Sequence, residues 1–137
     1  MTLYLDTSDL VKLYVAEPGA ARVHDLVRAA DVVVTSALAY PEARATFARR
    51  RRERLSTPAE HRAILRQFDD DWPRFVAMSF GDDLAREAGH LADRLRIRGA
   101  DAVHLASFAA LVARAGDDEV RFSCAEERLS RAARSLD

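Results

Sequence analysis

Carboxylate side chains stand at four places in the chain where a strand is expected to end or a helix to begin. These residues are Asp6, Glu42, Asp101 and Glu126. In an open α/β sheet, ligands bind in the crevice beyond the carboxyl ends of the strands, and residues in such places can meet there. Carboxylates gathered without cations repel one another and raise each other's pKa. The pattern therefore predicts a bound divalent metal and, with it, a metal-dependent phosphodiesterase.

Each of these acids also has a purely structural explanation. Asp6 closes an apolar strand and can cap the following helix through its side-chain oxygen. Asp9, in the same first turn, is explained by the helix dipole. Asp101 and Glu126 stand at helix starts, where acids are common, and an isolated helical acid such as Glu42 is usually solvated. The prediction of a site therefore rests on the whole set, because all four lie at ends of elements that would converge.

A histidine near one of these acids is a further candidate. His104 lies three residues after Asp101, about one turn along the same side of the expected helix. An imidazole there could ligate a metal, but a histidine between Val103 and Leu105 is more often a core residue. We expect His104 in the core or directly behind the ligands.

The strongest charge cluster is a basic segment from Arg44 to Arg54. It holds six arginines, and four of them, Arg49 to Arg52, are consecutive. At about 100° per residue, four consecutive side chains point all around a helix, so this end of the helix should stand clear of the core. A solvated helix end and a surface that contacts RNA or a partner both explain the segment.

Alternating strands and helices position these residues. Strands are expected at residues 3–5, 32–34, 75–78 and 120–122, and Val32-Val33-Val34 is apolar enough for burial on both faces. A helix capped by Thr7 or Ser8 should end at Pro18-Gly19. Further helices are expected at residues 20–30, from 36 or 40 to 55, 58–70, from 82 or 83 to Gly99, 101–114, and from 126. Strands separated by helices predict an α/β fold with a parallel sheet covered on both faces.

Length and composition are those of an ordinary globular protein. The 137 residues, 49% of them hydrophobic, suffice for one domain spanning 1–137. The single cysteine, Cys124, excludes an intramolecular disulfide and favours a reducing compartment. The first residues lack the features of a signal peptide, and the apolar stretch from 103 to 113 is too short to cross a bilayer. We expect a cytoplasmic protein without membrane contact.

Four segments of the sequence resemble the motifs of one known family. They are residues 3–14, which begin Leu-Tyr-Leu-Asp-Thr-Ser, residues 35–42, residues 101–106, which read Asp-Ala-Val-His-Leu-Ala, and residues 122–129. In this order they are similar to the motifs of the PIN-domain ribonucleases, in particular the VapC toxins of toxin–antitoxin pairs. The resemblance covers essentially the whole chain. It implies a PIN-like three-layer fold with a central, mostly parallel sheet of four or five strands and helices on both faces.

The same resemblance implies a metal-dependent endoribonuclease whose products carry a 5′-phosphate and a 3′-hydroxyl. Its catalytic residues, which would hold Mg²⁺ or Mn²⁺, would be Asp6, Glu42, Asp101 and Glu126. Oxygen ligands favour these hard ions. The family also implies an RNA substrate, a cognate VapB-like antitoxin and a homodimer. One motif departs from the family, because Cys124 and Glu126 stand where Thr and Asp are usual. The longer Glu126 could reach the metal from farther back or contact it through water.

Three other functions are compatible with parts of this pattern. A phosphohydrolase with an aspartyl nucleophile needs a second Asp two residues after the first and a downstream Lys. Here that position is Ser8, and the only lysine is Lys12. A phosphoacceptor receiver domain lacks the same downstream lysine. A non-catalytic PIN-like module that binds RNA or a protein stays open because of Cys124 and Glu126, and metal-dependent cleavage would distinguish it from a nuclease.

Overall fold

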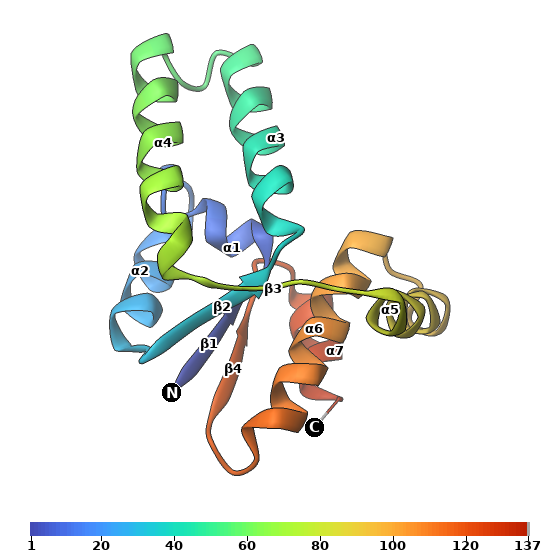
Figure 1. Ribbon diagram of the computed structural model, residues 1–137. Coiled ribbons are helices and arrows are strands. Elements are labelled where there is room, and N and C mark those ends of the chain that lie inside the picture. The colour runs from blue at the N-terminus through green and yellow to red at the C-terminus, as the bar shows by residue number, and fades with distance from the viewer. Residues whose placement is uncertain (137) are drawn as a thin grey trace.

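A parallel β-sheet of four strands, in the order β3-β2-β1-β4, lies at the centre of the computed structural model, which describes residues 1–136 (Figure 1). The strands are β1 (Thr2–Leu5), β2 (Val32–Ser36), β3 (Val76–Met78) and β4 (Val120–Ser123). In the register, Leu3 lies between Val33 of β2 and Arg121 of β4. The prediction of a mostly parallel sheet is confirmed, and every strand pairing is parallel.

Helices connect consecutive strands, as parallel pairing requires. They are α1 (Thr7–Val11), α2 (Ala20–Ala29), α3 (Ala39–Arg52), α4 (Pro58–Asp71), the 3₁₀ turn η1 (Trp72–Arg74), α5 (Asp82–Leu95), α6 (Gly99–Ala115) and α7 (Glu127–Arg134). Among residues 1–136, no helix combines the length and the apolar character needed to cross a membrane.

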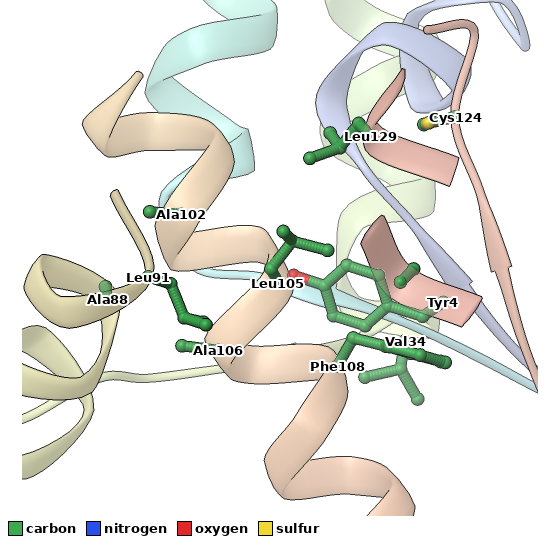
Figure 2. Packing of buried hydrophobic residues seen from close by; sticks show 11 residues of the cluster. Tyr4, Val34, Ala88, Leu91, Ala102, Leu105, Ala106, Phe108, Cys124 and Leu129 are labelled. Carbon is green, nitrogen blue, oxygen red and sulfur yellow. The ribbon is translucent and has the colours of Figure 1, made fainter. Parts of the chain in front are cut away.

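Each face of the sheet has its own hydrophobic core, because successive side chains of a strand point to opposite faces. Leu3 and Leu5 pack on one face with residues of α1, α2, α3 and α4. Tyr4 points to the other face and packs with residues of α5, α6 and α7, among them Leu105 and Phe108 (Figure 2). The predicted three-layer fold, with helices on both faces of the sheet, is confirmed.

Several predicted boundaries were wrong. The cap of α1 is Asp6 rather than Thr7 or Ser8, and α1 ends at Val11 because the next amides bond three residues back. Helix α5 ends at Leu95, where Arg96 adopts a left-handed conformation with φ 55°, so Gly99 begins α6 instead of ending α5. Val32 is 42% exposed, so β2 is not buried on both faces along its whole length.

Helices α3 and α4 form a hairpin that projects away from the sheet (Figure 1). Phe47 and Phe68 pack edge to face inside it, with ring centroids 5.5 Å apart. Of the four consecutive arginines of the basic segment, Arg49 and Arg52 are exposed as predicted, whereas Arg50 and Arg51 are half-buried. Arg50 pairs with Glu17, which lines the pocket described below.

Candidate active site

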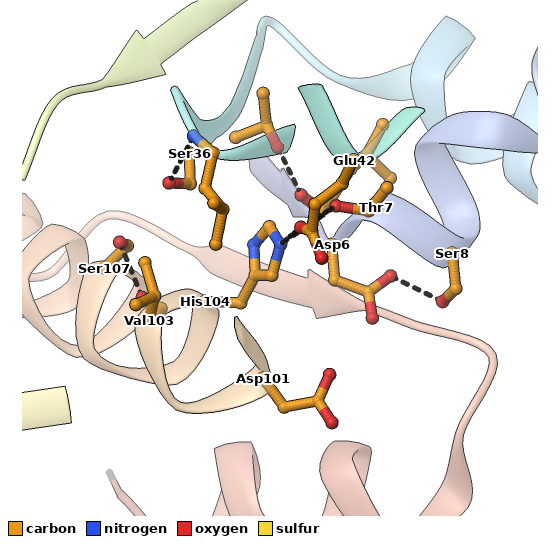
Figure 3. A network of polar contacts seen from close by, with 12 residues as sticks. Asp6, Thr7, Ser8, Ser36, Glu42, Asp101, Val103, His104 and Ser107 are labelled. Carbon is orange, nitrogen blue, oxygen red and sulfur yellow. Dashed lines mark hydrogen bonds and ion pairs between the residues drawn. The ribbon is translucent and has the colours of Figure 1, made fainter. Parts of the chain in front are cut away.

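One pocket of about 490 Å³ collects all four predicted carboxylates. Asp6 directly follows β1, Glu42 lies in the first turn of α3, Asp101 lies in the first turn of α6, and Glu126 is the residue directly before α7. Figure 3 shows three of them, Asp6, Glu42 and Asp101, arriving from three different elements. The structure thus brings the four acids to the carboxyl end of the sheet, while their role as metal ligands stays a prediction.

Asp6 is the most deeply buried of the four acids, with 4% of its surface exposed. Its Oδ1 accepts hydrogen bonds from Ser8 Oγ at 2.7 Å and from the Asp9 amide at 3.1 Å. Burial raises the pKa of Asp6 to about 6, although both hydrogen bonds act to lower it. The Oδ2 atom forms no hydrogen bond with a described residue. Asp6 therefore caps α1 with one oxygen and has the other oxygen free for a ligand.

Glu42 is held by two neighbours on the floor of the pocket. Its Oε1 accepts hydrogen bonds from Thr7 Oγ1 at 2.6 Å and from His104 Nε2 at 3.1 Å (Figure 3). Burial acts to raise the pKa of Glu42, but the hydrogen bonds from His104 and Thr7 outweigh it and hold that pKa below its ordinary value. Glu42 is thus kept as an oriented carboxylate, and Oε2 forms no hydrogen bond within residues 1–136.

His104 connects this carboxylate to the core. Its side chain is 2% exposed, and Nδ1 lies 2.8 Å from the Tyr4 hydroxyl. The Glu42 carboxylate can only accept, so Nε2 is the donor in the bond to Glu42. With the ring proton on Nε2, Nδ1 accepts from the Tyr4 hydroxyl, whose pKa is raised by burial. This position agrees with the expectation that His104 lies in the core directly behind the acids.

Asp101 and Glu126 occupy the more open side of the pocket. Both oxygens of Asp101 are bound by Arg98, with Nε 3.0 Å from Oδ2 and Nη2 3.4 Å from Oδ1. Glu126 is exposed, and its carboxylate forms no hydrogen bond with the described residues. Cys124 lies outside the pocket lining, where its Sγ donates to the Glu126 carbonyl at 3.1 Å. Cys124 therefore stabilises the turn before α7 rather than contacting the acids.

The donor set suits a hard divalent cation, but its members are not yet gathered around one point. Among residues 1–136, no group of three or more His, Cys, Asp or Glu side chains is already placed to hold a metal ion. Asp6 and Glu42 nevertheless each keep one unbonded carboxylate oxygen, and carboxylate oxygens are the ligands that Mg²⁺ and Mn²⁺ prefer. The chemistry of the residues therefore fits such an ion.

Sequence reasoning missed a buried ion network beside these acids. The helix dipole does not account for Asp9, because its side chain is fully buried and pairs with Lys12 at 3.0 Å and with Arg22 at 2.9 Å. Ser123 of β4 also donates to Asp9. The available signal was a lone lysine between Val11 and Leu13, three residues after an acid. Arg98 was also missed, although its spacing from Asp101 is that of a neighbour on the same helical turn.

The sequence is similar to those of known proteins. The family model described as PIN domain matches residues 3–134. Two similar proteins are Ribonuclease VapC45 of Mycobacterium tuberculosis strain CDC 1551 and Ribonuclease VapC49 of Mycobacterium tuberculosis strain H37Rv. Each is 38% identical over 105 residues, which cover 77% of this chain and 73% of the relative. Because the match extends from the first strand into the last helix, the chain belongs to the PIN-domain family and is VapC-like.

Proposed function

We propose that this protein is a metal-dependent endoribonuclease and the toxin of a VapBC-type toxin–antitoxin pair. The observation that supports this most strongly is the convergence of Asp6, Glu42, Asp101 and Glu126 on one pocket. The names of the two relatives, both called ribonucleases, supply the substrate class. Phosphodiester hydrolysis needs an activated water and neutralisation of the phosphate charge, and the pocket has the ligands for an ion that does both.

In this proposal, Asp6, Glu42 and Asp101, with Glu126 as a fourth ligand, would hold Mg²⁺ or Mn²⁺, which would supply water activation and Lewis acidity. The residues around them do the positioning. His104 and Thr7 orient Glu42, and Ser8 together with the Asp9 amide orients Asp6. Arg98 and Arg49 line the same pocket and are exposed, so they are available to RNA phosphates.

Cleavage by the Asp6→Asn variant tests the proposal. We expect purified wild type to cut a structured RNA with Mg²⁺ or Mn²⁺ and not with EDTA. Asp6→Asn should lose activity by about a hundredfold or more, because a formal charge at the metal is removed while the cap acceptor is kept. Asp93→Asn, an exposed acid on α5 outside the pocket, is the matched control and should cut like wild type. Full activity in Asp6→Asn would refute the site.

The alternative is a non-catalytic PIN module that binds RNA or a protein. Two observations favour it: the acids do not form a ready metal cage among residues 1–136, and Arg98 occupies both oxygens of Asp101. No cleavage by folded wild type with any divalent metal would favour the alternative over the nuclease.

A VapB-like antitoxin, a homodimer and a cytoplasmic location belong to the same proposal. Coexpression with the product of a short reading frame directly upstream should relieve growth arrest caused by this chain. Growth arrest that persists despite complex formation would contradict the toxin assignment. Light scattering of the purified protein would measure the dimer.

A further inference from the structure

Lys12 is the only lysine of the chain, and its side chain is buried in the wall of the pocket. The residue is 7% exposed, which is rare for lysine because burying an ammonium is costly unless it is paired. Its partner is Asp9, with Nζ 3.0 Å from Oδ1. Lys12 thus places a fixed positive charge beside a group of carboxylates.

Asp9 carries one negative charge but pairs with two positively charged side chains, Lys12 and Arg22. Arg22 donates to Oδ2 of Asp9 at 2.9 Å and to Ser123 at 3.2 Å. One carboxylate therefore faces two cations, and the network keeps one positive charge in excess. The Arg22 side chain is 51% exposed and lies outside the pocket lining, whereas Lys12 is buried and belongs to that lining. The excess charge is accordingly available in the pocket through Lys12.

The hydrogen-bonding capacity of Lys12 also indicates that it can bind a ligand in the pocket. An ammonium has three donors, and Asp9 accepts one of them. Within residues 1–136, Nζ has no second hydrogen-bond partner. Glu17, another acid in this wall, already pairs with Arg50 at 3.1 Å. The remaining donors of a buried ammonium need an acceptor, and the pocket is where a ligand can supply it.

We propose that Lys12 binds a non-bridging phosphate oxygen of the RNA in this pocket and is a further catalytic residue. The inference rests on the proposed function. Carboxylates repel a phosphodiester, so fixed cations favour RNA in this pocket; Arg49 and Arg98 are the exposed ones, and Lys12 is the buried one. An ammonium contacts phosphate well as a point charge. In this arrangement Asp9 acts as a positioning residue, because its hydrogen bond with Nζ fixes the position of the ammonium.

Binding of a short single-stranded RNA in EDTA, measured by fluorescence anisotropy at several salt concentrations, tests the phosphate contact without cleavage. Lys12→Gln should bind about tenfold more weakly, and the slope of log affinity against log salt should fall by about 0.7. Arg28→Gln is the matched control, since it removes a positive charge from α2 at an exposed position outside both the pocket and the Asp9 network. It should bind and cleave like wild type. Equal losses in both variants, or none in Lys12→Gln, would overturn the inference.

Wild-type protein provides a second test that needs no variant. The chain has two amines, the Met1 α-amine and Lys12, and the former pairs with Asp31 at 2.6 Å. Acetylation followed by mass spectrometry, with and without saturating RNA in EDTA, should show Lys12 protected and Met1 unchanged. If Lys12 is acetylated at the same rate with and without RNA, the contact is refuted, even if Lys12→Gln does not fold.

The two proposals fail in different ways. If wild type cleaves RNA and Lys12→Gln binds and cleaves equally well, only the Lys12 inference is wrong. If wild type binds RNA through Lys12 but never cleaves it, the nuclease proposal is wrong, and Lys12 remains an RNA-binding residue without catalysis.

Discussion

Tyr4, His104 and Glu42 form a chain of hydrogen bonds that leads from the core to the pocket. The Tyr4 hydroxyl fixes Nδ1 of His104, and Nε2 then donates to Glu42. Because both ends of the imidazole are bound, the ring cannot rotate without losing a hydrogen bond. Glu42 is half-buried and would otherwise have several rotamers, so this chain selects one orientation of its carboxylate.

Substitutions at His104 separate positioning from packing. Gln can place an amide nitrogen about where Nε2 lies, whereas Ala leaves Glu42 without that donor. We expect His104→Ala to lower kcat by about tenfold to a hundredfold with little change in KM, because misplacing one catalytic group has that effect. His104→Gln should restore most of kcat. Steady-state kinetics beside thermal melting would check this, and equal losses in both variants would show a packing role alone.

The residues of the site differ in how far sequence could predict them. Asp6 and Asp101 could be placed because a strand end and a helix start are local features. The role of Asp9 could not, because its partners Arg22 and Ser123 lie 13 and 114 residues away along the chain. Only the folded chain brings α2 and β4 against α1, so a buried ion network of this kind has little local signal.

The α3–α4 hairpin shows the same contrast for whole elements. Its second helix starts where Ser56-Thr57-Pro58 predicted, because a capping box is formed by residues close in sequence. Thr57 Oγ1 accepts from the Glu60 amide at 3.1 Å, and Glu60 accepts from the Thr57 amide at 2.8 Å. The end of α5 was misplaced because the left-handed Arg96 that stops it carries no glycine signal.

Removing the cap tests how much the hairpin depends on it. Thr57→Ala should lower the free energy of unfolding by about 1 kcal/mol, the usual effect of losing an N-cap acceptor. Thr57→Ser keeps that acceptor and should unfold like wild type. Urea titrations of the three proteins would measure the difference. RNA cleavage should not change, because Thr57 lies outside the pocket lining. A loss of activity in Thr57→Ala would mean that the hairpin tip takes part in substrate binding.

At the scale of the whole molecule, the buried acid of the site lowers the stability of the fold. The sheet and its two cores are built from local apolar patterns, and these predicted the fold well. The pocket at the carboxyl end instead gathers acids and holds Asp6 in surroundings that favour its protonated form. An ionised Asp6 in the metal-free protein therefore lowers global stability, and a bound cation should relieve this effect.

The pH dependence of unfolding in EDTA measures that effect. The pKa of Asp6 is about 6 in the folded protein against an ordinary value of 3.8, so between these pH values the folded state binds more protons than the unfolded state. Stability from this group is present at low pH and is lost as pH rises through that window. The difference between the two pKa values corresponds to at most about 3 kcal/mol of unfolding free energy lost at pH 7.

Asp6→Asn lacks this titration and keeps an oxygen that can cap α1. Its free energy of unfolding at pH 7 in EDTA should therefore equal or exceed that of wild type, and the gap should close towards pH 4. The comparison isolates Asp6, because Asp9 and its cations are present in both proteins. Adding Mn²⁺ should raise the Tm of wild type more than that of the variant, since only wild type has the full ligand set. If Asp6→Asn is instead much less stable at pH 7, capping of α1 outweighs the electrostatic cost of the buried carboxylate.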